Sequence, residues 1–246
     1  SKSHNQILFW SDSRGWLSNA GGDGNSYTSD SAKTRNYDSE TKDFFTSPEV
    51  DCVTIQVNPA KRAGKDTDLQ WNRHFAYVKN GINALIFWDE CKNTRKSQFN
   101  LFMASTAYRQ NGNVITADMQ NNMQMDVYLL NAQNPDVTGS WVPSAGKYGI
   151  PTVNGSEQQQ LIQYEQAGGE DYLTVLYAKS AGASGLSQQK LNTGSKDVTA
   201  FRMTHNASNT AFYIAYNDSE TEQKFSFQNA AAIRNPQTGE RVAARG

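Results

Sequence analysis

The chain has 246 residues, a formal net charge of −1 at pH 7 and 19% charged residues. A charge so near zero argues against a nucleic-acid or membrane-surface partner that is bound through charge alone. No run of about 18 apolar residues suggests a membrane-spanning helix. The length allows one large all-β domain or two smaller ones.

Short apolar runs bounded by turn residues predict strands from the start of the chain onward. The first runs are "NQILFWS" (residues 5–11) and "EVDCVTIQVN" (49–58). Between them, residues 11–46 are rich in Gly, Ser, Asn and Asp, and we expect a long loop with little strand content there.

The next two runs predict a β-hairpin. "WNRHFAYVK" (71–79) and "NALIFWDEC" (83–91) are joined by Asn80 and Gly81. An Asn-Gly pair between two apolar runs is a strong short-range hairpin signal.

The rest of the chain continues in the same way, with a polar interruption at residues 134–149. No segment shows a sustained 3.6-residue apolar stripe, so strands at this spacing favour an antiparallel β-sandwich over a parallel α/β fold. We therefore predict one all-β module over residues 1–246, with two large packed sheets and a small additional sheet at the C-terminal end. A subdivision near residue 150 stays open. The further predicted strands are 98–105, 113–118, 124–131, 158–166, 171–180, 197–205, 210–218, 223–229 and 240–245.

Cys52 and Cys91 are the two cysteines of the chain. Each lies on or beside a predicted strand. A disulfide between neighbouring strands and two buried free thiols are both compatible with this placement.

Among the three histidines, His4 and His74 lie on or beside predicted strands that can approach each other in space. Neutral imidazole suits zinc, and a carboxylate is a usual further ligand. From the residues alone, a hydrogen-bonded histidine without a metal is the more common outcome. His205 lies in a predicted turn and is expected to contact solvent.

The tryptophans divide by their surroundings. Trp10, Trp71 and Trp88 lie in apolar runs and are expected to pack in the core. Trp16 and Trp141 lie in polar segments and are the better candidates for stacking on a sugar ring.

Several segments in order resemble the β-sandwich region of the heparinase II/III-like polysaccharide lyases. They are "SHNQILF", "SPEVDCVTIQVN" and "WNRHFAYVKNGINALIFWDE", followed by "DYLTVLYAKSAG" and "FYIAYND". In the third segment Arg73 and His74 match the family's Arg-His pair, and Asp89 matches its closing aspartate. Members of the family carry an α/α toroid before this region, so the resemblance implies that the chain is the β half of a longer lyase.

The resemblance also implies a structural zinc ion held by His4, Asp23 and His74, which would fix a loop beside the substrate cleft. It implies an acidic, uronic-acid-containing polysaccharide as substrate and β-elimination as the reaction. Arg73, Trp16 and Trp141 are then the expected substrate contacts. A periplasmic or extracellular location follows from the substrate class.

The sequence departs from the family at positions that matter for catalysis. Lys2 stands where some members have a histidine, Gln6 replaces a threonine, and "NPAKRAG" (58–64) has no tyrosine. We therefore assign no catalytic residue and expect no lyase activity from this chain alone. The alternative is a free-standing carbohydrate-binding or structural β-sandwich without catalysis.

Overall fold

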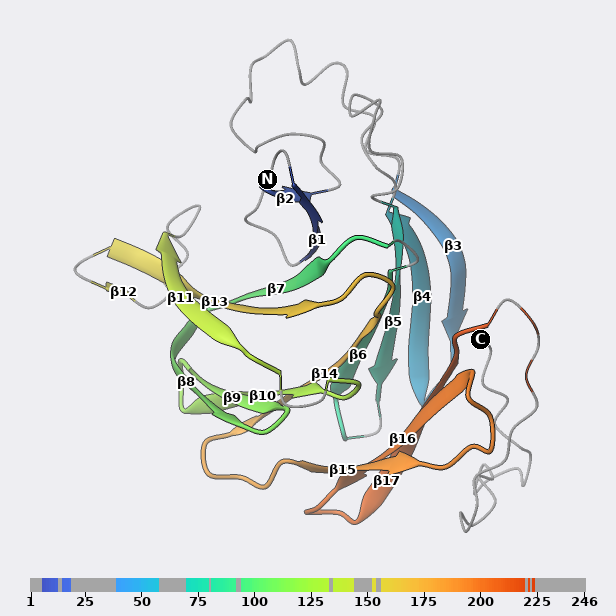
Figure 1. The fold of residues 1–246 in the computed structure, drawn as a ribbon. Coiled ribbons are helices and arrows are strands. Elements are labelled where there is room, and N and C mark those ends of the chain that lie inside the picture. Colours follow the sequence, from blue (N-terminus) through green and yellow to red (C-terminus); the bar gives the residue numbers. More distant parts are fainter. Residues whose placement is uncertain are drawn as a thin grey trace. The chain divides into compact units, whose positions relative to one another are not determined.

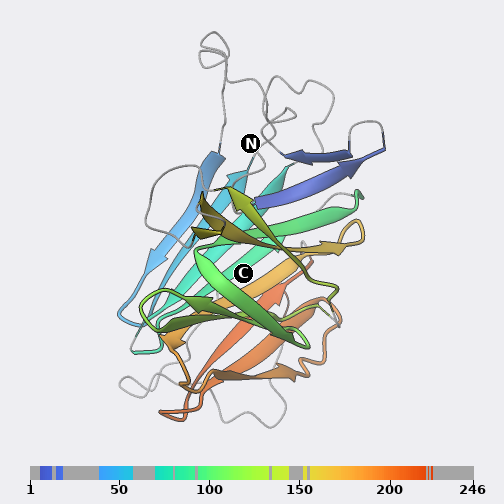
Figure 2. The ribbon, with the colours of Figure 1, turned by 90° about the vertical axis from the view of Figure 1, so that its left-hand side faces the viewer.

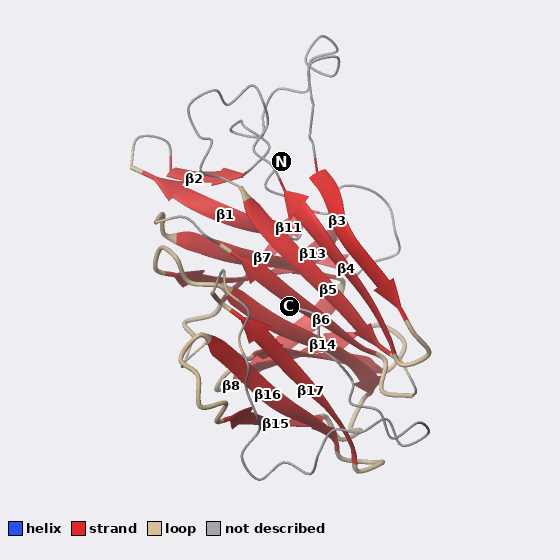
Figure 3. Cartoon of the chain, turned by 90° about the vertical axis from the view of Figure 1, so that its right-hand side faces the viewer, coloured by secondary structure: helices blue, strands red, loops and turns tan. Residues whose placement is uncertain are grey.

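The computed structural model describes residues 6–12, 15–18, 39–57, 70–79, 81–91, 94–132, 135–143, 152–153, 156–219, 221 and 223. Throughout this part of the chain the regular elements are β-strands (Figure 3), which confirms the predicted fold class. No helix in it is long and apolar enough to cross a membrane. The chain divides into two compact units, Ser1–Ala183 and Ser184–Gly246. The subdivision expected near residue 150 falls outside the described residues.

The first unit contains an eight-stranded antiparallel sheet (Figure 1). The predicted Asn-Gly hairpin lies at its centre and is confirmed: β5 and β6 pair directly, and Gly81 takes a φ of 81° in the turn. This positive φ suits a residue without a Cβ atom. The strands in spatial order are β3 (Ser39–Thr46), β4 (Val50–Val57), β5 (Trp71–Val78), β6 (Ala84–Glu90), β14 (Tyr172–Ser180), β10 (Met123–Leu129), β9 (Val114–Met119) and β8 (Ser105–Asn111).

The same unit contains a six-stranded sheet. In Figure 2 its dark blue β1–β2 hairpin lies beside the green β7, as the strand pairing requires. The strands in spatial order are β11 (Thr138–Pro143), β13 (Ser156–Gln166), β7 (Ser97–Met103), β1 (Gln6–Ser11) and β2 (Gly15–Ser18), and β12 (Thr152–Val153) pairs with β13.

The core of the first unit lies between these two sheets. Alternate residues of each strand point inward, as the two-residue period of a strand dictates. Phe9 and Ile162 of the six-stranded sheet and Ile115, Val127 and Leu129 of the eight-stranded sheet are all fully buried in one apolar cluster. The first unit is therefore a β-sandwich, as the sequence predicted.

The second unit contains a small three-stranded antiparallel sheet, which agrees with the predicted additional sheet at the C-terminal end. Its buried side chains include Val198, Phe201 and Met203. The strands are β15 (Leu186–Leu191), β16 (Val198–His205) and β17 (Thr210–Asn217).

Five strands of four residues or more lie where no strand was predicted: β2, β3, β8, β11 and β15. The expectation of a largely strand-free loop over residues 11–46 and of a polar interruption at 134–149 was therefore wrong in part. Each of these five strands is the edge of its sheet. An edge strand has one open side and buries less, so polar residues there obscure the alternation that reveals a strand.

Candidate functional site

The two faces of β5 carry different chemistry. Trp71 and Arg73 point toward the six-stranded sheet and are 4% and 9% exposed. Their neighbours Asn72 and His74 point to the opposite side, which we call the outer face of the eight-stranded sheet. The adjacent Arg-His pair is thus divided between the interior and the outer face.

His74 is held on the outer face by its neighbours on both sides. Thr54 on β4 and Trp88 on β6 lie opposite it in the strand register. The Thr54 hydroxyl oxygen lies 2.9 Å from Nδ1 of the imidazole. The Trp88 indole stacks on the ring at a centroid distance of 4.3 Å and an interplanar angle of 18°. The imidazole therefore has a fixed position and a fixed orientation.

The other ring nitrogen of His74 is buried and has no hydrogen-bond partner among the described residues. The Glu90 carboxylate is close to it, with its Oε2 3.8 Å from Nε2. Asn72 donates a hydrogen bond of 2.6 Å to the same oxygen and holds it in place. An imidazole nitrogen beside a carboxylate is a suitable pair of groups for binding a metal ion.

Asp171, which directly precedes β14, supports this arrangement. It accepts a hydrogen bond of 2.8 Å from the indole nitrogen of Trp88 and one of 2.7 Å from the backbone nitrogen of Cys91. Trp88, and with it His74, is therefore tied to the end of β6.

His4 and Asp23, the other expected zinc ligands, lie outside the described residues. Within the described residues no group of three or more His, Cys, Asp and Glu side chains could hold a metal ion. The zinc site thus stays a prediction, and His74 is the part of it that can be seen. His205, at the end of β16, is bound by the hydroxyl of Ser208 at 2.7 Å.

Arg73, the expected substrate contact, forms an ion pair with Asp89 in the interior. Its Nε and Nη2 donate to the two carboxylate oxygens at 2.5 and 2.9 Å. The guanidinium also lies 4.8 Å from the Trp71 ring centroid. Burial raises the pKa of Asp89, while the positive charge of Arg73 opposes this shift. The structure thus places Arg73 within the fold, with a side chain 11% exposed.

Of the two tryptophans expected to contact substrate, Trp16 lies on β2, and the side chain of Trp141 on β11 is outside the described residues. Trp16 is opposite Trp10 in the register, and their rings meet edge to face at a centroid distance of 5.2 Å. Trp10 was expected in the core, which is wrong, because it is 38% exposed. Trp71 is buried as expected.

Trp10 could have been found by counting along its strand. Phe9 is fully buried, so Trp10 must point away from the core. Its Nε1 donates a hydrogen bond of 2.9 Å to Asp12, and Lys96 lies 5.6 Å from the Trp16 ring centroid. Arg95 and Glu165 lie beside these residues, bonded to Trp10 and Lys96. We call the whole set the Trp10 corner, which consists of Trp10, Asp12, Trp16, Arg95, Lys96 and Glu165.

Side-chain amides continue the outer face of the six-stranded sheet beyond the Trp10 corner. Gln163 donates to Gln98 at 2.8 Å and to Asn100 at 2.6 Å. Gln98 in turn donates to Glu165 at 3.2 Å. These groups form a polar ladder across β7 and β13, in which Gln98 and Asn100 are 7% and 1% exposed and bond mainly to the other members of the ladder.

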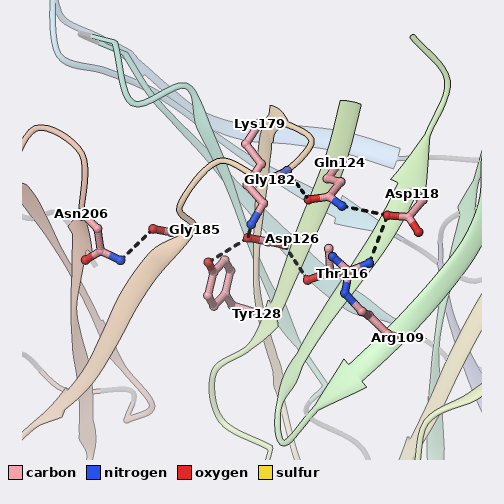
Figure 4. A network of polar contacts seen from close by, with 10 residues as sticks. All are labelled: Arg109, Thr116, Asp118, Gln124, Asp126, Tyr128, Lys179, Gly182, Gly185 and Asn206. Carbon is pink, nitrogen blue, oxygen red and sulfur yellow. Dashed lines mark hydrogen bonds and ion pairs between the residues drawn. The ribbon is translucent and has the colours of Figure 1, made fainter. Parts of the chain in front are cut away.

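A second polar network lies on the outer face of the eight-stranded sheet, over β8, β9, β10 and β14 (Figure 4). Asp126 accepts a hydrogen bond of 2.7 Å from Thr116 and pairs with Lys179 at 2.7 Å. Hydrogen bonds from Gln124 and Arg109 lower the pKa of Asp118. Because these carboxylates each have several partners, we interpret this network as structural.

The architecture of the first unit defines the chain as an antiparallel β-sandwich protein. Among solved structures, the fold is similar to heparan sulfate lyase HepC from Pedobacter heparinus, with a TM-score of 0.51 and 11% sequence identity. That match covers 75% of this chain and 29% of the enzyme. A structure of a heparinase III gives a TM-score of 0.51 at 10% identity and covers 73% of this chain and 27% of the other. At such identities the likeness shows the fold alone.

The chain therefore spans less than a third of the length of these neighbours. No family model matches the sequence, and no curated protein matches it.

Proposed function

We propose that this chain is the β-sandwich module of a polysaccharide lyase related to the heparinases, which cleaves uronic-acid-containing polysaccharide by β-elimination. The observation that carries the proposal is the setting of His74. One nitrogen is engaged by Thr54, and the other is buried without a hydrogen-bond partner among the described residues, at the position where the family resemblance puts a zinc ligand. The fold shared with heparan sulfate lyase HepC supports it.

In this proposal His74 is one ligand of a structural zinc ion, together with His4 and Asp23. The residues that are described fit such a role. If Nδ1–H donates to the Thr54 hydroxyl, the lone pair of Nε2 is left for the metal, which is how outer partners commonly orient a histidine ligand. The zinc ion would fix the segment that contains Asp23 and so stabilise one wall of a substrate cleft.

The reaction itself needs three groups, and neither the family resemblance nor the described residues assign a complete set of them to this chain. β-Elimination requires a group that neutralises the uronate carboxylate, a base that removes the C5 proton and an acid that protonates the leaving oxygen. Arg73 is committed to Asp89 in the interior, and Lys2 stands where some family members have a histidine. We propose that the complete protein takes these groups from an additional domain and acts in the periplasm or outside the cell.

The test is the metal content of the purified 246-residue chain, prepared without a His tag or added zinc, compared among single histidine variants. We expect about one zinc ion per chain in the wild type, and loss of zinc in His4→Ala and His74→Ala. His205→Ala is the matched control and should keep its zinc, because His205 is hydrogen-bonded to Ser208 in the second unit. A wild type without metal, or zinc retained in His74→Ala, would overturn the proposal.

A further inference from the structure

The Trp10 corner presents an aromatic ring that is both exposed and held in one orientation. The hydrogen bond from the indole nitrogen to Asp12 and the edge-to-face contact with Trp16 fix the ring while 38% of Trp10 remains accessible. An indole that is already oriented loses little conformational freedom on binding, so its contact area is available for affinity.

The charges of the Trp10 corner cancel. Lys96 is paired with Glu165, and the formal charges of Asp12 and Arg95 are opposite. Arg95 also donates to the backbone oxygen of Trp10 at 3.4 Å. The formal charges of these four described residues sum to zero, so together they give no net positive charge with which to attract a polyanion.

Hydrogen-bonding side chains lie next to the ring on the same face. Gln98 faces Leu8 across β1 and β7, and Glu165 faces Gln98 across β7 and β13. Gln98 is only 7% exposed, so the accessible group beside the ring is the Glu165 carboxylate, whose side chain is 40% exposed. An aromatic ring bordered by a carboxylate matches a sugar, because a pyranose has an apolar face of C–H groups and a rim of hydroxyls.

We propose that the Trp10 corner binds a polysaccharide strand by stacking a pyranose ring on Trp10, with sugar hydroxyls bound by the partly exposed carboxylate of Glu165. The site recognises ring faces and hydroxyls, and the acidic groups of the sugar contribute little. This inference rests on the proposed polysaccharide function and specifies a binding subsite for it. It also reverses the sequence-based expectation, because Trp10 takes the stacking role and Trp16 supports it.

The experiment measures binding of the full 246-residue chain to heparan sulfate and to the same polymer after reduction of its carboxyl groups, by calorimetry. We expect Trp10→Ala to weaken binding about tenfold and Trp10→Phe about threefold. Phe44→Ala removes an exposed aromatic from β3, where the ring is 64% exposed, and is the matched control that should bind like the wild type. The carboxyl-reduced polymer should bind within about threefold of the native one, and raising the salt from about 50 to about 300 mM should change affinity less than about twofold.

Three outcomes would overturn the inference: no binding by the wild type, equal binding by Trp10→Ala, or binding that is lost with the carboxyl groups and at high salt. The last outcome would point to a charged site elsewhere on the chain. Zinc content measured in the same preparations separates the two proposals. If the chain contains zinc but does not bind the polysaccharide, the inference about the Trp10 corner is overturned and the lyase-module proposal is not. Binding that depends on Trp10 in a chain without zinc removes the lyase-module proposal and leaves a carbohydrate-binding β-sandwich.

Discussion

Arg73 and His74 are adjacent in the sequence and differ in how completely their polar atoms are bound. Arg73 points inward and shares both of its forked hydrogen bonds with Asp89, among aromatic rings. His74 points outward and has one nitrogen hydrogen-bonded and one without a hydrogen-bond partner among the described residues. A buried charge that is paired in this way stabilises the fold, whereas a ring nitrogen without a hydrogen-bond partner is the feature on which the proposed ligand role of His74 rests.

The comparison shows that residue type alone does not tell which side chain is paired in the interior and which lies on the outer face. The family resemblance marks the Arg-His pair as a unit, and the sequence suggested a substrate role for Arg73. The strand period separates the two residues, and the register then decides their partners: Asp89 for Arg73, and Thr54 and Trp88 for His74. The predictions below test each side of this contrast.

The largest effect is expected on the inner face. Asp89→Asn leaves the Arg73 guanidinium buried without its counter-charge, which should reduce the free energy of unfolding by about 3–5 kcal/mol. Urea unfolding measures the loss. Asp118→Asn is the matched control, because Asp118 is 41% exposed and pairs with an exposed arginine, so its loss should be below about 1 kcal/mol. Equal losses in the two variants would contradict the structural role of Arg73.

A smaller effect is expected from Trp88→Phe. This change keeps an aromatic ring beside His74 and removes the hydrogen bond from the indole nitrogen to Asp171. Because Asp171 is buried and keeps its bond to the Cys91 backbone, we expect a loss of about 1–2 kcal/mol in the free energy of unfolding. A variant as stable as the wild type would show that Asp171 does not fix this ring.

Thr54→Val is expected to change zinc affinity much more than it changes the free energy of unfolding. Valine keeps the shape of threonine and removes the hydroxyl that contacts Nδ1 of His74. We expect the metal-free protein to lose about 1 kcal/mol or less, because Thr54 is only partly buried. Zinc affinity, measured by competition with a chelator, should fall about 10–100-fold, as for other outer partners of ligand histidines. An unchanged zinc affinity would mean that Thr54 does not orient a ligand.

The sequence was sufficient for the central strands and insufficient for the edges. Strands such as β6 and β14, buried between neighbours, are recognisable as apolar runs, and Asn80-Gly81 predicts the turn that joins β5 to β6. The edge strand β3, "SETKDFFT", exposes polar side chains as well as Phe44, so its sequence does not form an apolar run. For the candidate site, the sequence was enough to single out His74 as a candidate residue. The contacts of Thr54 and Trp88 depend on the register of three strands, and the exposure of Trp10 depends on which face of β1 meets the core.

The smallest effect is expected for the two cysteines. They also differ in burial, and the difference should appear in the reactivity of their thiols. Cys52 lies on β4 and is partly exposed, whereas Cys91 is 1% exposed in the core, and both are free thiols. Burial raises the pKa of both thiols, and that of Cys91 is raised well above its ordinary value. In the folded protein at about pH 8, a disulfide reagent should therefore label Cys52 slowly and Cys91 not at all, because the thiolate is the reacting species. Equal labelling rates would contradict the burial of Cys91.

The folded state also holds the Cys91 proton to a higher pH than the unfolded state does. The resulting contribution to stability is fully present below the unfolded pKa of about 8.5 and is lost as the pH rises toward the folded pKa. Cys91→Ala should flatten this decline above about pH 9, while Cys52→Ala should flatten it less.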